Sequence, residues 1–397
     1  MRTTSLTLLC VSVLAVSACG PRADVGAQES DAEVATAVED AWSAVGLPQQ
    51  ARGGNDISGP YDVDENWPEN ACGEGYQGGA VGGVFAETPD RVFVFQRGCL
   101  PALENAGAPV PTRNTSGFDL SREDPERHPR WDHILMIFDR EGKLVESWEQ
   151  HNHLFVRPHR VKVSPYDPER HVWVIDDGAH SIYKFTRDGD LVMTLGEFRV
   201  PGDDETHFAR VTDIAWLPDG TFFVSDGYTN TRVMKFTADG EFVLQWGERG
   251  NNGSETRPGY MNTVHGVAVD DQRRVYVSDR SNHRVQVFDE DGNYLSEWPE
   301  HRPYYSYMSA DQHLWVSDGD HSKIMKFDLD GKLLFSWGTF GTYPGAMWGP
   351  HQFSVDSEDN LYVSDVHVGR VQKFIPKPGA NPSLLVGQEI GWGGGSD

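Results

Sequence analysis

The sequence predicts an all-β protein, a six-bladed β-propeller. The chain repeats a unit in which apolar and polar residues alternate with a period of two, and Asp-Gly or Glu-Gly turns join successive strands. Two of the units read "TFFVSDGYTNTRVMKFTADGEFVLQWGE" and "RVYVSDRSNHRVQVFDEDGNYLSEWPE". A recurring aspartate marks the period of roughly 40 to 50 residues that is typical of propeller blades. These marker aspartates are Asp176, Asp226, Asp279, Asp318 and Asp365.

A sixth, degenerate unit precedes these five. It begins with "RVFVFQRG", is interrupted by a long loop from Leu100 to Trp131, and resumes with "HILMIFDREGKLVESWEQ". Six units predict six blades. Two segments compete to supply the strand that closes the ring, namely "GPYDVDENW" near residue 62 and "PSLLVGQEI" near residue 386.

The N-terminus reads as a processing segment. Residues 1–18 combine an early arginine with an apolar run, and "VSAC" ends at Cys19, where a bacterial lipoprotein signal places its lipidated cysteine. The alternative is an ordinary secretory signal. We expect residues 19–60 to be a lipidated tether and 61–397 the propeller, anchored through lipid only in a bacterial cell envelope, at the periplasmic face or the outer membrane.

The net charge argues against one class of function, and the cysteine content predicts a disulfide. The 397 residues carry 60 acidic against 34 basic side chains, a formal net charge of −26, which argues against nucleic-acid binding. After removal of the signal and lipidation of Cys19, only Cys72 and Cys99 remain. An even pair in an oxidising compartment predicts a disulfide. We expect a monomer.

Three histidines occupy equivalent positions of the repeat. In a propeller the first strand of each blade lines the channel, and the position fourteen residues before the marker aspartate defines a ring. The ring residues, with an allowance for a longer turn in blade two, are Gly82 or a near neighbour, His159, Thr212, His265, Tyr304 and His351. Histidines in blades two, four and six would converge on the axis as a tripod for Zn²⁺ with an open position. The alternative is that they contact only channel water.

A second ring lies one residue beyond the marker position. It places Arg97 and Arg280 at the mouths of blades one and four, and Tyr228 follows one residue later in blade three. Arginine offers a planar fork to a carboxylate, and a tyrosine beside cations can act as a base, so the set suits an anionic substrate. Rim salt bridges and a packed aromatic ring are the alternatives. The histidines after the marker aspartates, expected to be turn residues, are His180, His283, His321 and His367.

These residues, in order from "YDVDENWP" to "LYVSDVHVGRVQKF" and including "RPHRVKVS", "SDGYTNTRV", "VHGVAVD" and "GPHQFSVD", resemble the peptidyl-α-hydroxyglycine α-amidating lyases. That family consists of six-bladed propellers of NHL-type repeats. The resemblance implies a zinc ion on His159, His265 and His351. It also implies that the enzyme cleaves the N–Cα bond of a peptidyl or N-acyl α-hydroxyglycine to give an amide and glyoxylate.

The resemblance further assigns roles to side chains. Tyr228 matches the base, and Arg97 and Arg280 match the arginines that hold the substrate carboxylate and the developing charge. A structural calcium ion would bind Val84, Val161 and the residue after the third histidine. That residue is Gln352 here rather than an aspartate, which predicts a weaker site.

The chain also differs from the family at Gly349, where the family has a bulkier residue. This difference predicts a reshaped pocket. Two functions from other classes stay open. One is a different metal-dependent propeller hydrolase. The other is a tethered, non-catalytic propeller that binds a protein or a glycan through its loops.

Overall fold

The computed structural model describes residues 57–102, 129–251, 253–299 and 301–392. The signal segment, Cys19, nearly all of the expected tether and most of the loop between Leu100 and Trp131 lie outside the described residues. All described residues belong to one compact unit, within 49–397. Within the described part of the chain, no helix is both long enough and apolar enough to span a membrane.

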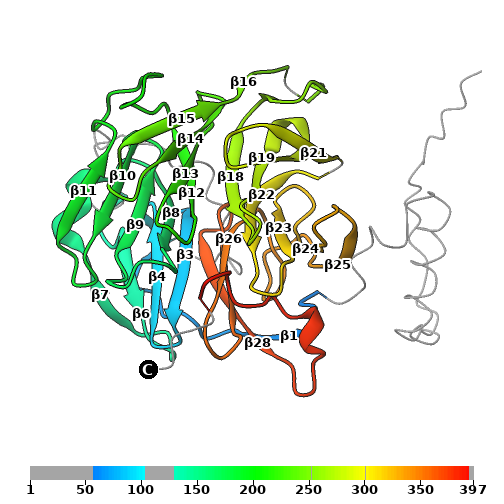
Figure 1. The fold of residues 1–397 in the computed structure, drawn as a ribbon. Coiled ribbons are helices and arrows are strands. Elements are labelled where there is room, and N and C mark those ends of the chain that lie inside the picture. The colour runs from blue at the N-terminus through cyan, green and yellow to red at the C-terminus, as the bar shows by residue number, and fades with distance from the viewer. Residues whose placement is uncertain (1–56, 103–128, 252, 300, 393–397) are drawn as a thin grey trace, which may run out of the picture. The chain divides into compact units, whose positions relative to one another are not determined.

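The described chain folds into six four-stranded antiparallel sheets, the blades of a propeller (Figure 1). The innermost strands of neighbouring blades contact one another around the central channel. From the channel outward, the first three blades are β3 (Val81–Thr88), β4 (Arg91–Gln96), β6 (Leu135–Phe138) and β7 (Leu144–Ser147); β8 (Pro158–Val163), β9 (Val172–Asp176), β10 (Ser181–Phe185) and β11 (Leu191–Leu195); and β12 (Val211–Trp216), β13 (Phe222–Asp226), β14 (Arg232–Phe236) and β15 (Phe242–Trp246).

The last three blades follow the same order. They are β18 (Val264–Val269), β19 (Val275–Asp279), β20 (Arg284–Phe288) and β21 (Tyr294–Pro299); β22 (Pro303–Met308), β23 (Leu314–Asp318), β24 (Lys323–Phe327) and β25 (Leu333–Trp337); and β26 (Pro350–Val355), β27 (Leu361–Asp365), β28 (Arg370–Pro376) and β1 (Tyr61–Asp64).

The N-terminal strand β1 closes the ring. It pairs antiparallel with β28, from Tyr61 opposite Pro376 to Asp64 opposite Lys373. Of the two segments that competed in the sequence, the one near residue 62 therefore supplies the outer strand of blade six. The other forms the short 3-10 helix η4 (Pro382–Leu384) and then packs on β1, where the Val386 N–H donates to the Tyr61 hydroxyl at 2.8 Å.

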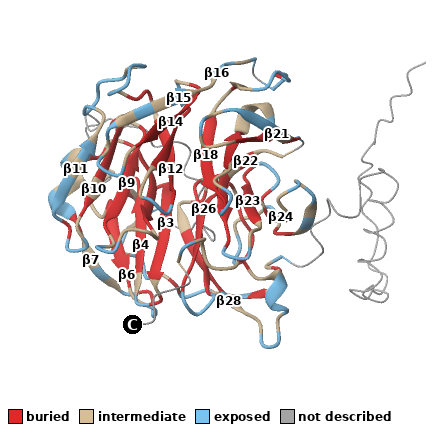
Figure 2. Ribbon diagram, in the orientation of Figure 1, coloured by how far each residue is buried: buried red, intermediate tan, exposed pale blue. Residues whose placement is uncertain are grey.

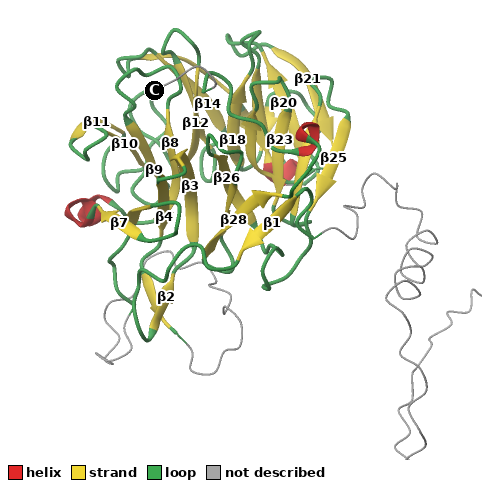
Figure 3. Ribbon diagram, turned by 90° about the horizontal axis from the view of Figure 1, so that it is seen from below, coloured by secondary structure: helices red, strands yellow, loops and turns green. Residues whose placement is uncertain are grey.

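The remaining elements are short and lie outside the blades (Figure 3). They are β2 (Tyr76–Gly78) paired with β5 (Cys99–Pro101), β16 (Glu248–Arg249) paired with β17 (Tyr260–Met261), and the 3-10 helices η2 (Glu149–Leu154) and η3 (Arg280–Asn282). A disulfide between Cys72 and Cys99 fastens β5 to the turn before β2.

Burial falls from the channel outward (Figure 2). Every residue of β8, β12, β18 and β26 is buried, whereas the outer strand β11 is half-buried to exposed. Apolar side chains fill the space between blades, as where Trp337 packs against Tyr61 and Phe374 with ring centroids 5.8 and 5.4 Å away. Each such fully buried side chain contributes roughly 2 kcal/mol. The inner strands are thus rigid, and they carry the site.

Candidate metal and substrate site

In every blade the innermost strand carries an irregularity at the ring position. In β8, Pro158 pairs with Asp176 and Arg160 with Ile175, so His159 has no partner on β9. A β-bulge of this kind bends the strand and re-aims a side chain. The same shift in register brackets each ring residue, namely Gly82, His159, Thr212, His265, Tyr304 and His351. The positional equivalence expected from the repeat is therefore present in all six blades.

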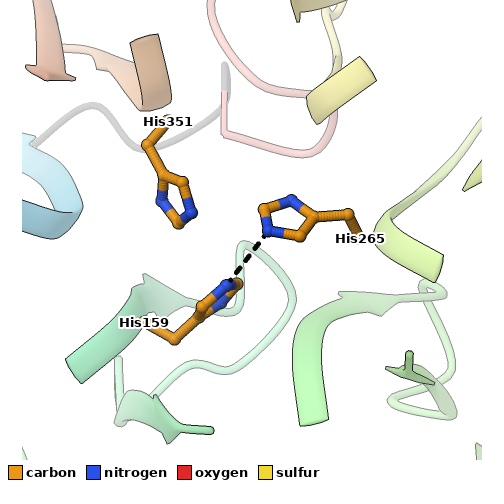
Figure 4. Close-up of side chains that lie close together, drawn as sticks. All are labelled: His159, His265 and His351. Carbon is orange, nitrogen blue, oxygen red and sulfur yellow. Dashed lines mark hydrogen bonds between the residues drawn. The ribbon is translucent and has the colours of Figure 1, made fainter. Parts of the chain in front are cut away.

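The three ring histidines converge inside the channel (Figure 4). His159, His265 and His351 are buried, and one ligand nitrogen from each lies within 4.8 Å of the others. The Nε2 atoms of His159 and His265, joined by the dashed line in Figure 4, are 3.3 Å apart. Within the described residues these histidines form the one cluster of three or more His, Cys, Asp or Glu side chains with metal-binding geometry.

Backbone carbonyls of the neighbouring blades hold each imidazole by its other nitrogen. His159 Nδ1 lies 2.7 Å from the Thr212 oxygen, His265 Nδ1 lies 2.6 Å from the Tyr304 oxygen, and His351 Nδ1 lies 2.6 Å from the Gly82 oxygen. Because a carbonyl can only accept, each Nδ1 must carry the proton and donate it. Each Nε2 therefore presents a lone pair to the channel, the arrangement that orients metal-binding histidines.

Burial lowers the pKa of all three histidines well below the usual value, and neighbouring arginines lower it further. One of these is Arg160, which sequence reasoning missed. Arg160 is fully buried and donates to the Tyr304 oxygen at 2.7 Å and to the Gly82 oxygen at 3.3 Å, two of the carbonyls that orient histidines. The imidazoles are consequently neutral, as ligands must be.

The histidine cluster fits a zinc ion. Two Nε2 lone pairs facing each other at 3.3 Å repel unless something positive lies between them. Tetrahedral zinc with Zn–N bonds of about 2.0–2.1 Å requires ligand nitrogens about 3.3 Å apart. Three histidines leave one position open, which is the pattern of catalytic rather than structural zinc sites.

Tyr228, which belongs to blade three, contacts the histidine cluster. Its Oη lies 2.7 Å from His265 Nε2 and 3.2 Å from His159 Nε2. Since both nitrogens are acceptors, the phenol O–H donates to the nearer one, His265 Nε2, in the absence of an ion. The tyrosine expected to be a base is therefore within reach of any group bound beside the three nitrogens.

The two predicted arginines lie at the same place. Arg97 is almost completely buried and donates from Nε to the Pro158 oxygen at 3.2 Å, and burial together with the charge of Arg157 lowers its pKa to about 10. The Arg280 guanidinium makes no hydrogen bond or ion pair with the described residues. It lies over the rings of Tyr228 and Tyr304, 5.2 and 4.7 Å from their centroids. A cation in this state is free to bind an anion.

A cavity of about 250 Å³ joins these groups. It is lined by Ala80, Arg97, Arg157, Arg210, Tyr228, Arg280, Tyr304, His351, Val366 and His367. Sequence reasoning assigned no role to Arg157, Arg210 or Tyr304 as substrate contacts. A signal was available, because Ala80, Arg157 and Arg210 all lie two residues before a ring position.

Of the four histidines expected to be turn residues, His367 lines the cavity. Gly349 makes room for it, since a Cβ at residue 349 would come 2.5 Å from His367 Cδ2, and the φ of 79° also favours glycine. A bulkier residue at position 349 would therefore displace His367, and the reshaping expected from Gly349 stays a prediction. Among the others, His180 and His283 adopt left-handed turn conformations, and His321 pairs with Asp318 at 3.0 Å.

The residues expected to bind calcium are arranged differently from a calcium site. Gln352 is buried and donates from Nε2 to the Val161 oxygen at 2.8 Å. The Val161 oxygen thus already accepts a hydrogen bond, whereas the buried Gln352 Oε1 has no hydrogen-bond partner among the described residues. Calcium at Val84, Val161 and Gln352 stays a prediction of the resemblance.

Comparisons with known proteins agree with the fold. A family profile described as NHL repeat matches residues 261–288. The rat (Rattus norvegicus) protein named peptidylglycine alpha-amidating monooxygenase is 32% identical over 241 residues, which cover 59% of this chain and 23% of the rat protein. The Drosophila melanogaster protein named peptidyl-alpha-hydroxyglycine alpha-amidating lyase 1 is 25% identical over 359 residues, which cover 83% of this chain and 62% of the fly protein.

The matched regions thus span less than two thirds of either relative. Among solved structures, one described as streptogramin B lyase superposes with a TM-score of 0.52 at 12% identity, over 80% of this chain and 98% of that one, which shows the fold alone. Fold and site together define a six-bladed NHL propeller with a buried histidine triad able to hold a metal ion. By sequence, the chain is similar to proteins named peptidyl-alpha-hydroxyglycine alpha-amidating lyase, and it contains an NHL repeat.

Proposed function

We propose that this chain is a zinc-dependent lyase. It would cleave the N–Cα bond of a peptidyl or N-acyl α-hydroxyglycine and release an amide and glyoxylate. The observation that carries the proposal is the 3.3 Å approach of two histidine Nε2 lone pairs, beside a tyrosine hydroxyl and an arginine-lined cavity. The names of the relatives support the same class of reaction.

The residues of the site divide the chemistry among them. When bound to the three Nε2 atoms, zinc would supply Lewis acidity toward a substrate hydroxyl. Arg280, which has no counter-ion among the described residues, pairs with the carboxylate of the hydroxyglycine. This pairing places the Cα hydroxyl at the open side of the histidine cluster, next to Tyr228.

Tyr228 moves the proton. Tyr228 acts as a phenolate, having lost its own proton to solvent before the step, and its Oη takes the hydroxyl proton as the C=O bond of glyoxylate forms and the N–Cα bond breaks. The electron pair of that bond goes to the amide nitrogen, which receives the proton back from Tyr228. Arg97, charged and buried, stabilises the negative charge that builds during cleavage. Atoms and charge balance without any other reactant.

The test is glyoxylate release from N-benzoyl-α-hydroxyglycine, measured before chelation, after chelation and after zinc is restored. We expect activity that chelation removes and zinc restores. A folded, zinc-loaded protein that releases no glyoxylate from benzoyl or peptidyl substrates would contradict the proposed reaction. A folded protein that binds no zinc at all would favour the non-catalytic propeller.

We also propose that the enzyme is held at a bacterial cell envelope by lipid on Cys19. The "VSAC" sequence and the acidic, Gly- and Ala-rich segment that follows support this location. Metabolic labelling with a fatty acid should mark the wild-type chain and not a Cys19→Ser variant. Labelling of both would refute the anchor.

A further inference from the structure

We propose that Trp348 and Phe340 form an apolar subsite at the edge of the cavity, so that the preferred substrate carries a large apolar side chain on the acyl group before the hydroxyglycine. The inference rests on the proposed function for the position of that acyl group. It concerns the loop between β25 and β26, which joins blades five and six and to which no role has been assigned.

The cavity has a charged side and an apolar side. Its four arginines belong to blades one to four, and none of the described residues of blade six adds an arginine to the lining. The apolar side chains in the lining are Ala80 and Val366, from blades one and six, whose inner strands β3 and β26 contact each other. Blade one lies across the ring from blade four. A substrate carboxylate held by Arg280 in blade four therefore leaves the acyl group to extend toward the apolar side.

Trp348 continues this apolar side toward the surface. Its backbone N–H donates to Asp365 Oδ2 at 2.8 Å, and its carbonyl accepts from the His367 N–H at 3.3 Å. Between these two bonds, the Val366 N–H donates to the Gly349 oxygen at 3.1 Å. The rings of Trp348 and His367 have centroids 6.1 Å apart. The indole is thus held by backbone bonds beside two residues that line the cavity.

Phe340 extends the apolar surface further outward. Its ring packs edge-on against Trp348, with centroids 5.2 Å apart. Phe340 is 60% exposed, the highest value for a large apolar side chain among the described residues, and Trp348 is half-buried. Adjacent apolar rings that face solvent beside a cavity are typical of a ligand-binding groove. An apolar group of the substrate would cover both rings.

The two rings lie within reach of an acyl group bound at the histidine cluster. Trp348 precedes His351 by three residues, so at most about 11 Å of chain separates their Cα atoms. One amino-acid residue extends about 3.5 Å along its backbone, and its side chain adds to this reach. The side chain of the residue before the hydroxyglycine can therefore contact Trp348 while the hydroxyl stays at the cluster.

The experiment compares two unreactive ligands that differ by one benzyl group. N-acetylglycine and N-(3-phenylpropanoyl)glycine are titrated calorimetrically into the full-length, zinc-loaded protein. We expect the phenylpropanoyl ligand to bind about tenfold more tightly or better, because burial of about 60 Å² of apolar surface is enough for this factor. The double variant Phe340→Ala, Trp348→Ala should bring the ratio of the two affinities close to one without weakening N-acetylglycine. Trp348→Phe should keep part of the preference.

Leu334→Ala is the matched control, because Leu334 is also an exposed apolar residue but lies on the outer strand β25 of blade five. The control should keep the full preference, and melting temperatures verify that each variant is folded. Equal affinity of the wild-type protein for the two ligands, or no binding of either, would overturn the subsite. An equal loss for both ligands in the double variant would also overturn it.

Sedimentation of the same proteins tests the other occupant of these rings. A wild-type dimer that the double variant does not form, together with no preference between the ligands, would assign the rings to a second copy of the chain and overturn the subsite. A wild-type protein that shows the preference and sediments as a monomer would support it.

Glyoxylate release from the corresponding N-acyl-α-hydroxyglycines separates the two proposals. Preferential binding of the phenylpropanoyl ligand without release from either substrate would uphold the subsite and refute the lyase reaction. Release from both substrates at equal kcat/KM, with equal binding of the two ligands, would do the reverse.

Discussion

His351 Nδ1 lies 2.6 Å from the carbonyl oxygen of Gly82, although 269 positions separate the two residues in the chain. Residue 82 must be glycine because blade two is so close: a Cβ there would come 2.3 Å from the Pro158 oxygen. Gly82→Ala should therefore displace this carbonyl and loosen His351. We expect zinc affinity to fall about 10- to 100-fold, the usual cost of losing a group that orients a ligand.

Zinc affinity can be measured by competition with a chromophoric chelator. Gly379→Ala serves as the control, because nothing lies within 4 Å of a Cβ at that position. The control should lose some stability from its φ of 76° but keep its zinc affinity. Equal zinc affinity in the wild-type protein and Gly82→Ala would show that the carbonyl does not orient His351.

Removal of a histidine ligand should empty the metal site. We expect the purified wild-type protein to contain about one zinc per chain, and His265→Ala to contain close to none, because two imidazoles rarely retain a catalytic zinc. Elemental analysis after dialysis against a weak chelator measures this. His321→Ala, altered at a surface histidine that pairs with Asp318, is the control and should retain its metal. Unchanged zinc in His265→Ala would refute the tripod.

Loss of the Tyr228 hydroxyl should separate catalysis from metal binding. Tyr228→Phe keeps the ring between its arginine neighbours and removes the Oη that lies 2.7 Å from His265 Nε2. We expect kcat for glyoxylate release to fall about 10²- to 10⁴-fold, the range for loss of an acid–base group, with unchanged zinc content. A fall smaller than threefold would exclude Tyr228 as the base.

Gln352 should make the channel independent of calcium. Because its amide already donates to the Val161 oxygen, we expect the melting temperature of the wild-type protein to be the same in calcium and in a calcium chelator. Gln352→Asp replaces that donor with a charged oxygen, so its melting temperature should rise when calcium is added. Scanning calorimetry measures both, and a calcium-dependent wild type would support the ion that the resemblance implies.

The Cys72–Cys99 disulfide should stabilise the fold without contributing to the chemistry. It closes a loop of 27 residues, for which loop-closure entropy predicts a stabilisation of about 3.5 kcal/mol. The double variant Cys72→Ala, Cys99→Ala should lose roughly this free energy of unfolding in urea denaturation. It should keep its zinc, because neither sulfur lies at the histidine cluster. A metal-free double variant would show that the bridge also holds the site.

Much of the site could be predicted from the sequence because the chain is built from repeated units. The bulge that aims His159, His265 and His351 into the channel recurs in each blade. An offset of fourteen residues from the marker aspartate therefore locates His265 and His351, and an allowance for the longer turn in blade two locates His159. A second position, one residue beyond the marker, located Arg97 and Arg280. Periodicity, turn residues and equivalence between blades depend on residues close together in the chain. They can therefore be recognised from the sequence alone.

Only the tertiary structure decided the rest. The choice of β1 to close the ring depends on a pairing between Tyr61 and Pro376 across the whole chain, which no local pattern encodes. The proton on each histidine Nδ1 is set by backbone carbonyls, which every residue has. The sharing of Asp177 between Arg157 and Arg210 joins two blades through side chains alone. These contacts arise because ring closure brings distant segments together in the buried interior of the channel, where polar groups are shielded from bulk solvent and are hydrogen-bonded to one another.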